Sequence, residues 1–402
     1  MRVDFRAQPK NLAHERFEVR DPLSPGLPAP DADAAAHSAR VVASVRDAIA
    51  AAGGWIPFAD YMQHVLYAPG LGYYTAGARK LGPSGDFVTA PEMTPLFGQA
   101  LAAPVAAIHQ ATGTTTVLEL GAGSGALALE LLGALPGIRY CILEVSPDLR
   151  ERQMQALSAH AARVTWLARL PDAIEGVVVM NEVLDAVPPR LLARRDGAWY
   201  ERGVAWDGAQ GQLAWEDKPL AAGALRSLAQ SRLPAEGDYV SEVNPAAEAL
   251  VRAIAMRVTS GAIIAIDYGF PRAEYYHPQR AEGTLMGHYR HRSHADPFLL
   301  PGLSDLTAHV DFTAVAEAGV AGGLRVAGYT SLAAFLVGAG LLDRLAAVGD
   351  PVSPRFIREA AAVQRLLSPA EMGELFKVIV LAQKSGGIVW PYLQAADRSH
   401  RL

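Results

Sequence analysis

The sequence predicts an α/β fold built on a parallel, doubly wound sheet, and two observations support this. From Thr114 onward, short apolar runs rich in β-branched residues alternate with segments of helical periodicity. At 402 residues, half of them hydrophobic, the chain can also bury the large core that such a sheet requires. Strands that alternate with helices are typical of parallel sheets, because parallel neighbours need a crossover connection.

The residues ahead of the sheet are expected to be irregular at first and then helical. Residues 1–33 combine mixed charge with prolines and predict an irregular arm. Residues 34–110 form a predicted helical region, in which helical spacing over 34–52 ends at a Gly-Gly pair. A short helix within 57–77 and a glycine-rich loop leading into a helix to about residue 107 follow.

The predicted sheet domain covers residues 111–402. Each strand is predicted from a short apolar run. The strands are expected at 116–120, 140–145, 164–168, 177–181, 261–270, 324–330 and 376–384. Its helices share apolar positions at helical spacing and are expected at 126–132, 148–160, 246–258, 312–319 and within 331–366.

Two insertions interrupt this alternation. The first covers about 190–245, and its short pieces as far as Pro219, split by Asp-Gly and Gly-Gln turns, predict antiparallel hairpins inserted into the sheet. The second, at 271–310, is rich in His, Tyr, Arg and Pro and is expected to form a loop that faces solvent or substrate.

Composition excludes several classes of function. The net charge of -5 comes from interspersed acids and bases, so no basic stripe for nucleic acid is present. One cysteine, Cys141, excludes a disulfide framework and a thiolate metal cage, and it indicates a reducing compartment. The first 21 residues lack the apolar core of a secretory signal, and no apolar run is long enough to span a bilayer. We therefore expect a cytoplasmic protein without membrane insertion.

A glycine cluster follows the first predicted strand of the sheet. Gly121, Gly123 and Gly125 lie between that strand and a helix, where the backbone can approach a ligand closely. With Ala126 they satisfy the dinucleotide fingerprint, and Glu144 lies at about the distance of its ribose-binding acid. The same cluster also suits S-adenosylmethionine (SAM), so the glycines alone do not separate these two ligands.

Glu119 separates them, because an unpaired buried carboxylate is costly and needs a partner. A pyrophosphate at this turn would be repelled, whereas the ammonium or sulfonium of SAM would stabilise the acid. In this interpretation Gly121 to Gly125 wrap the methionine part and Glu144 accepts the ribose hydroxyls. A salt bridge from Glu119 within the fold is the structural alternative.

Long motifs then indicate a family. They are GDFVTAPEMTPLFG (85–98), LELGAGSGAL (118–127), YCILEVSPDLRERQ (140–153), NEVLDAVP (181–188), the run from IDYGF to HYRHR (266–292) and DLTAHVDFTAVAEAG (305–319). The chain resembles the MidA-type methyltransferases, which include the mitochondrial complex I assembly factor that methylates arginine. The resemblance implies a class I SAM-dependent fold, Rossmann-like with seven strands and the last antiparallel. It also implies SAM as cofactor, covered by a loop with Asp86, and a protein acceptor, by analogy a respiratory NADH dehydrogenase subunit.

Acids after the strand 177–181 are the catalytic candidates. The carboxyl end of this strand opens at the ligand crevice, so Asn181, Glu182 and Asp185 can converge there. If the segment turns helically, Glu182 and Asp185 share a face and can orient a guanidinium by paired hydrogen bonds. Asn181 is expected to contact the cofactor. The open alternative is that Asp185 caps a helix while Glu182 contacts the cofactor amine.

Further candidates lie on the acceptor side of the crevice. Glu242, Asp267 and His309 are predicted to contact substrate. No metal is expected, because the histidines of the second insertion lack HExxH spacing and cysteine partners. The sequence thus predicts a SAM-dependent methyltransferase acting on a protein arginine. The alternatives are an NAD-dependent oxidoreductase and a SAM-binding assembly protein without turnover, and the oligomeric state is open.

Overall fold

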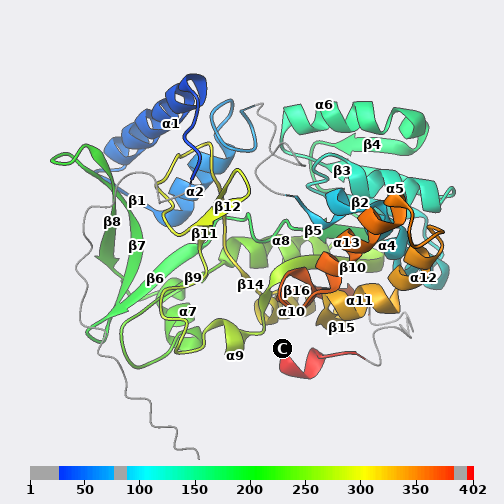
Figure 1. Ribbon diagram of the computed structural model, residues 1–402. Coiled ribbons are helices and arrows are strands. Elements are labelled where there is room, and N and C mark those ends of the chain that lie inside the picture. Colours follow the sequence, from blue (N-terminus) through cyan, green and yellow to red (C-terminus); the bar gives the residue numbers. More distant parts are fainter. Residues whose placement is uncertain (1–26, 77–87, 384–395) are drawn as a thin grey trace, which may run out of the picture.

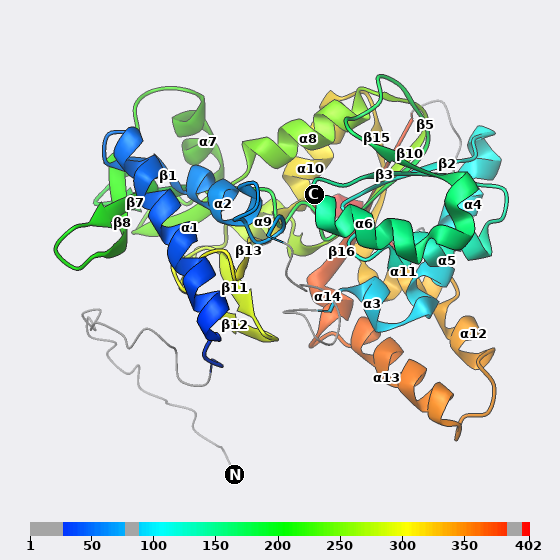
Figure 2. The same cartoon turned by 90° about the horizontal axis from the view of Figure 1, so that it is seen from above.

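The computed structural model describes residues 27–76, 88–383 and 396–402 (Figure 1). Most of the predicted N-terminal arm and the loop with Asp86 lie outside these residues. The described chain forms a larger body around one sheet and a smaller body around another, and the two stand side by side when seen from above (Figure 2).

An eight-stranded sheet organises the larger body of the described chain, in the order β15-β16-β10-β5-β2-β3-β4 with β14 beside β10. Its strands are β2 (Thr116–Leu120), β3 (Arg139–Leu143), β4 (Val164–Leu167), β5 (Ile174–Asn181), β10 (Val258–Phe270), β14 (Val310–Asp311), β15 (Arg325–Ser331) and β16 (Phe376–Ala382). The strands from β4 to β10 pair in parallel, whereas β16 is antiparallel to both β10 and β15. The predicted class I fold with an antiparallel last strand is confirmed, and the two-residue strand β14 is an addition to the seven strands that were predicted.

Helices cover both faces of this sheet. One core cluster joins α4 (Pro95–Thr112), α5 (Ala126–Ala134), α11 (Leu332–Gly338) and α13 (Pro354–Leu367) to one face. A second cluster joins α8 (Pro245–Ala255) and α10 (Phe312–Ala321) to the other. Neighbouring strand residues such as Val117 and Leu118 belong to opposite clusters. The strands are buried on both faces, and for that reason their sequences are continuous apolar runs.

The smaller body has a five-stranded sheet of its own within the described residues. Its strands are β1 (Trp55–Pro57), β6 (Arg190–Arg195), β7 (Ala198–Asp207), β8 (Gln212–Pro219) and β9 (Tyr239–Val243). The predicted hairpins are present, but the expectation that they enter the main sheet is wrong. Instead β7 pairs with β1, a strand that the helical prediction for 34–110 had missed, because three residues are too few to show periodicity.

Helices α1 (Ala32–Ala51) and α2 (Phe58–Tyr67) pack on this second sheet through Val41, Val45 and Tyr61. The other face of the sheet packs on α7 (Ala224–Arg232). The second insertion forms a three-stranded sheet of β11 (Met286–Tyr289), β12 (Arg292–His294) and β13 (Asp305–Thr307). Its Leu306 joins the apolar cluster of α1 and α2, which ties this insertion to the smaller body.

Short elements complete the described chain. They are α3 (Ala90–Met93), α6 (Pro147–Ala156), η1 (Ser158–Arg163), α9 (Arg272–Tyr275), α12 (Leu341–Ala346), α14 (Met372–Leu375) and η2 (Ser399–Arg401).

Candidate functional site

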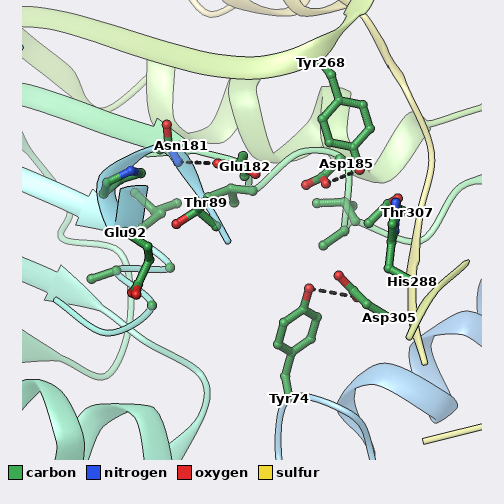
Figure 3. Close-up of a pocket in the computed structure, with 18 of the residues that line it drawn as sticks. Tyr74, Thr89, Glu92, Asn181, Glu182, Asp185, Tyr268, His288, Asp305 and Thr307 are labelled. Atoms are coloured by element: carbon green, nitrogen blue, oxygen red, sulfur yellow. Dashed lines mark hydrogen bonds between the residues drawn. The ribbon is translucent and has the colours of Figure 1, made fainter. Parts of the chain in front are cut away.

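A cavity of about 940 Å³ opens at the carboxyl ends of β2, β3 and β5. One end is lined by the glycine turn and α3, and the other by residues of α2, β11 and β13 (Figure 3). Ligands bind at this edge of open α/β sheets, because the loops after parallel strands gather there. The cavity therefore lies between the two bodies, with a sheet-side end and an insertion-side end.

The glycine turn has the predicted backbone geometry. Gly121, Gly123 and Gly125 have φ angles of 63°, 56° and 86°, in the left-handed region that favours glycine. Gly121 and Gly123, predicted to contact the cofactor, line the cavity. Gly125 does not line it. It is the N-cap of α5 and faces Gln153 and Leu157, so its role is to turn the chain into the helix.

Glu119 has a partner within the fold, although not the salt bridge considered as the alternative. Its Oε2 accepts a hydrogen bond of 2.8 Å from the Tyr140 hydroxyl. The side chain is 3% exposed and lines the cavity. Burial raises the pKa of Glu119 to about 7, and the Tyr140 hydrogen bond opposes this only in part. The acid can therefore take up or lose a proton near neutral pH and would be ionised by a cation in the cavity.

Glu144 follows β3 and lines the same end of the cavity. Its carboxylate accepts hydrogen bonds from the Ser146 backbone N–H at 2.9 Å and from Gln153 Nε2 at 3.0 Å. Gln153 Nε2 also donates to the Gly123 carbonyl at 2.9 Å. One amide thus links the glycine turn to the acid at the position where related sheets bind ribose.

The segment 181–188 is not helical, so the expectation of a shared helical face for Glu182 and Asp185 is wrong, as is a helix cap at Asp185. Glu182 has a φ of 54°, which turns its side chain toward α3. Its Oε1 accepts from Asn181 Nδ2 at 3.0 Å and from the Ala90 N–H at 3.4 Å (Figure 3). Burial, followed by the charge of Asp185, raises the pKa of Glu182 to about 8. Asn181 lines the cavity beside it.

Asp185 lies toward the insertion side. Its Oδ2 accepts a 2.6 Å hydrogen bond from the Tyr268 hydroxyl, while its Oδ1 has no hydrogen-bond partner among the described residues. The residue is 5% exposed and lines the cavity. Burial raises the pKa of Asp185 to about 6. A buried oxygen without a donor at a cavity wall is suited to accept a hydrogen bond from a ligand.

The structure does not place Glu242 and Asp267 on the cavity wall, so their prediction as substrate contacts is wrong. Glu242 is 2% exposed and accepts from the Thr284 and Leu285 N–H groups at 2.8 and 2.9 Å. Asp267 is 1% exposed and also accepts from backbone N–H groups. Both carboxylates hold turns together, which sequence spacing cannot distinguish from a ligand contact.

His309, predicted to contact substrate, lines the insertion side of the cavity, and its ring meets Tyr268 and Phe270 edge-on. Burial lowers the pKa of His309 to about 4, and that of His288 on the same wall to about 4 as well, so both are neutral at pH 7. Within the described ranges no group of three or more His, Cys, Asp or Glu side chains could hold a metal ion.

Several lining residues were missed from the sequence. Glu92 on α3 accepts from the Ser124 hydroxyl and so ties α3 to the glycine turn. Tyr67 and Tyr74 stack with ring centroids 5.4 Å apart, and Tyr74 donates to Asp305 at 2.9 Å (Figure 3). The only signal was the clustering of tyrosines on either side of Pro69-Gly70.

The lining is strongly acidic. Its acids are Glu92, Glu119, Glu144, Glu182, Asp185 and Asp305. Among described lining residues the single Lys or Arg is Arg365, which is mostly exposed and pairs with Glu371 at 3.3 Å. Such a cavity favours cationic ligands. SAM, with its ammonium and sulfonium, fits this chemistry, whereas a pyrophosphate would meet repulsion at Glu119.

Comparison with known proteins supports this assignment. Residues 100–330 match the family described as "Putative S-adenosyl-L-methionine-dependent methyltransferase". A crystal structure from Burkholderia thailandensis, with S-adenosyl-homocysteine bound, is 51% identical and superposes with a TM-score of 0.89. That match covers 94% of this chain and all of the other.

Curated relatives include the protein arginine methyltransferase NDUFAF7 of Homo sapiens, 28% identical over 82% of this chain and 80% of that one. The Drosophila melanogaster homolog is 29% identical over 82% of each chain. Both are labelled mitochondrial, so the prediction of a cytoplasmic location is contradicted. A single cysteine indicates a reducing compartment but does not specify which one.

The strand order of the main sheet also distinguishes between the two cofactors considered for the glycine turn. In the main sheet β16 lies antiparallel between β10 and β15, unlike the strand order 3-2-1-4-5-6 of the dinucleotide fold. The NAD-dependent alternative is therefore not supported. No helix in the described part of the chain is both long and apolar enough to cross a membrane. By its family match, its sheet order and its acid-lined glycine turn, this chain belongs to the MidA-type family of SAM-dependent methyltransferases, with the class I fold.

Proposed function

We propose that this methyltransferase modifies an arginine nitrogen of a protein acceptor, and that Asp185 holds the guanidinium. One observation carries the proposal: the buried Oδ1 of Asp185 lacks a donor at the wall of an acid-lined cavity. A guanidinium is always charged and presents several N–H donors in a plane, so it supplies both the charge and the hydrogen bond that this oxygen lacks.

The two ends of the cavity then have different tasks. SAM, when bound, supplies an electrophilic methyl group. Gly121, Gly123 and Glu144 are proposed to hold it, with Glu119 compensating its positive charge. Asp185 orients the acceptor. It is the proposed recipient of the proton that the nitrogen would lose when its bond to the methyl carbon forms, while the bond from that carbon to the sulfur of SAM breaks and S-adenosyl-homocysteine leaves. A pKa of about 6 suits this role, since the carboxylate is largely ionised at neutral pH and can still accept a proton.

Glu182 is proposed to act on the cofactor side. Its carboxylate faces Asn181 and the N–H of Ala90 at the start of α3, away from the Tyr268 contact of Asp185. In this assignment both acids belong to the site, Glu182 acting on SAM and Asp185 on the acceptor. The position of Asp86 lies outside the described residues, and its proposed role as a cofactor contact rests on the family resemblance alone.

The smaller body is proposed as the wall against which the acceptor protein docks. Tyr67 and Tyr74 of this body line the insertion-side end, and aromatic faces suit the stacking of a planar cation. The curated relatives are named protein arginine methyltransferases. Following the family resemblance, we propose a respiratory complex I subunit as acceptor, modified in a flexible segment before assembly.

Incubation of the enzyme with methyl-labelled SAM and the isolated subunit tests this proposal. Label should appear on arginine and disappear when the acceptor arginine is changed to lysine. Asp185→Asn should keep SAM affinity but lose transfer, because an amide supplies no negative charge. Label on lysine, on a carboxylate or only on a small metabolite would refute the arginine assignment.

A further inference from the structure

We propose that Asp267 is a positioning residue that holds Asp185 from two sides and so sets where the acceptor nitrogen lies. The inference rests on the proposed function, in which Asp185 contacts the acceptor. Asp267 itself touches neither ligand, because it is 1% exposed and does not line the cavity. It acts through the two hydrogen-bonded connections described next.

The first connection is to the backbone of the turn that carries Asp185. Oδ2 of Asp267 accepts from the Leu184 N–H at 3.0 Å and from the Asp185 N–H at 3.3 Å. This turn belongs to no helix or strand, so its N–H groups have no partners from regular secondary structure. The carboxylate of Asp267, on the adjacent strand β10, accepts their hydrogen bonds instead and so holds the turn at a fixed position relative to the sheet.

The second connection runs through Tyr268. Oδ1 of Asp267 accepts from the Tyr268 N–H at 2.9 Å. The Tyr268 ring packs edge-on against His309 and Phe376, and its hydroxyl donates to Asp185 Oδ2 at 2.6 Å. One carboxyl group therefore orients both the backbone of Asp185 and the phenol that binds its side chain. With Oδ2 of Asp185 occupied by Tyr268, Oδ1 is the oxygen left for the ligand.

Both oxygens of Asp267 are needed for this arrangement. In Asp267→Asn one oxygen is replaced by an NH₂ group, which donates and cannot accept from a backbone N–H. Either the turn at Leu184 and Asp185 or the N–H of Tyr268 loses its acceptor. Because a displacement of about 1 Å in an aligned group can lower the rate about 100-fold, a small shift of Asp185 would be visible in turnover.

The test compares Asp267→Asn and Tyr268→Phe with the control Asp311→Asn. Asp311 is also a largely buried aspartate that accepts from a backbone N–H, that of Ala314 at 3.1 Å, but it does not line the cavity. Measurements are SAM affinity by calorimetry, kcat and KM for an arginine peptide, and hydrogen exchange of the amides at 184 and 185.

Asp267→Asn should keep SAM affinity within about twofold, speed exchange at Leu184 and Asp185, and lower kcat/KM about 10- to 100-fold. Tyr268→Phe should lower kcat/KM while these amides stay protected, since it removes only the phenol connection. Asp311→Asn should change neither kcat/KM nor the exchange of the amides at Leu184 and Asp185. The rest of the protein should retain wild-type exchange in all three variants, which separates positioning from general unfolding.

Unchanged kcat/KM in a folded Asp267→Asn protein would overturn the inference, and so would a loss of SAM affinity that parallels the loss of activity. If the wild-type enzyme methylates no arginine peptide, the proposed function fails instead. The exchange measurement then still decides whether Asp267 holds the turn, because it requires no acceptor.

Discussion

Cofactor binding should depend on pH through Glu119, and Glu119→Gln should remove this dependence. In the protein without ligand, burial raises the pKa of Glu119 to about 7, so near neutral pH a large share of the molecules carry a neutral acid. A bound cation stabilises the ionised form. Binding below pH 7 therefore releases a proton, and affinity rises with pH through about 7 before it levels off.

The size of the effect follows from this pKa. If Glu119 is ionised in the complex, the dissociation constant varies as one plus ten to the power of pKa minus pH. SAM should then bind about tenfold more weakly at about pH 6 than at about pH 8, which corresponds to a difference in binding free energy of about 1.4 kcal/mol. Above pH 7 the loss of a charged contact in Glu119→Gln should weaken binding by about 1.5 to 3 kcal/mol.

Calorimetry at several pH values, in buffers of different ionisation enthalpy, measures both the affinity and the protons released. The amine of SAM and the carboxyl of Glu182, with a pKa of about 8, also titrate in this range. Their contributions occur in both proteins, so the difference between wild type and Glu119→Gln isolates Glu119. Glu175→Gln, exposed on β5, is the matched control. Equal pH slopes in wild type and Glu119→Gln would refute the reasoning.

Three further predictions test the glycine turn, the acid cluster and the smaller body. Gly123→Val should abolish SAM binding, because a branched residue at a φ of 56° is strained, whereas Gly133→Val, with no atom within 4 Å of the added Cβ, should bind normally by calorimetry. The protonated Glu182 contributes stability that is complete below its ordinary pKa of 4.5 and is lost as pH rises through about 8. The melting temperature of ligand-free Glu182→Gln should therefore rise relative to that of wild type between about pH 5 and pH 8. Gly203→Ala should cost about 1 to 3 kcal/mol in urea unfolding, because its Cβ would lie 2.2 Å from the Ile56 carbonyl, while Gly208→Ala, in open space, should match wild type.

The main sheet could be predicted because its strands carry their signal locally. Buried parallel strands are continuous apolar runs, and the turn at Gly121 to Gly125 needs glycine for its backbone. The smaller body was harder to foresee. β1 is formed by residues 55–57 and exists only because β7, far away in the chain, pairs with it. Local patterns do not contain such a partner.

The site was predictable where a residue follows a strand and not where it depends on a turn. Glu119 and Glu144 were placed in the cavity by the sheet itself. Glu182 and Asp185 also reach it, but the left-handed backbone at Glu182 separates their directions. Glu242 and Asp267 have the same residue types as ligand-binding acids, and only the structure shows that backbone N–H groups occupy their oxygens. Tyr67 and Tyr74 come from the N-terminal region, which has no pattern that links it to the site.

The pairing of β1 with β7 also sets an order of events during synthesis. Trp55 emerges from the ribosome 150 residues before its partner Ala205, since 205 minus 55 is 150. At a synthesis rate of about 5 to 20 residues per second, β1 remains without its pairing strand β7 for about 8 to 30 s. The Tyr61 hydroxyl waits longer still, until the Pro297 carbonyl is made. The acids of the cofactor end, Glu92 to Glu182, are all made before residue 183, whereas the acceptor end combines early residues such as Tyr67 with late ones such as Asp305. The acceptor end therefore cannot form until well after the acids of the cofactor end have been synthesised.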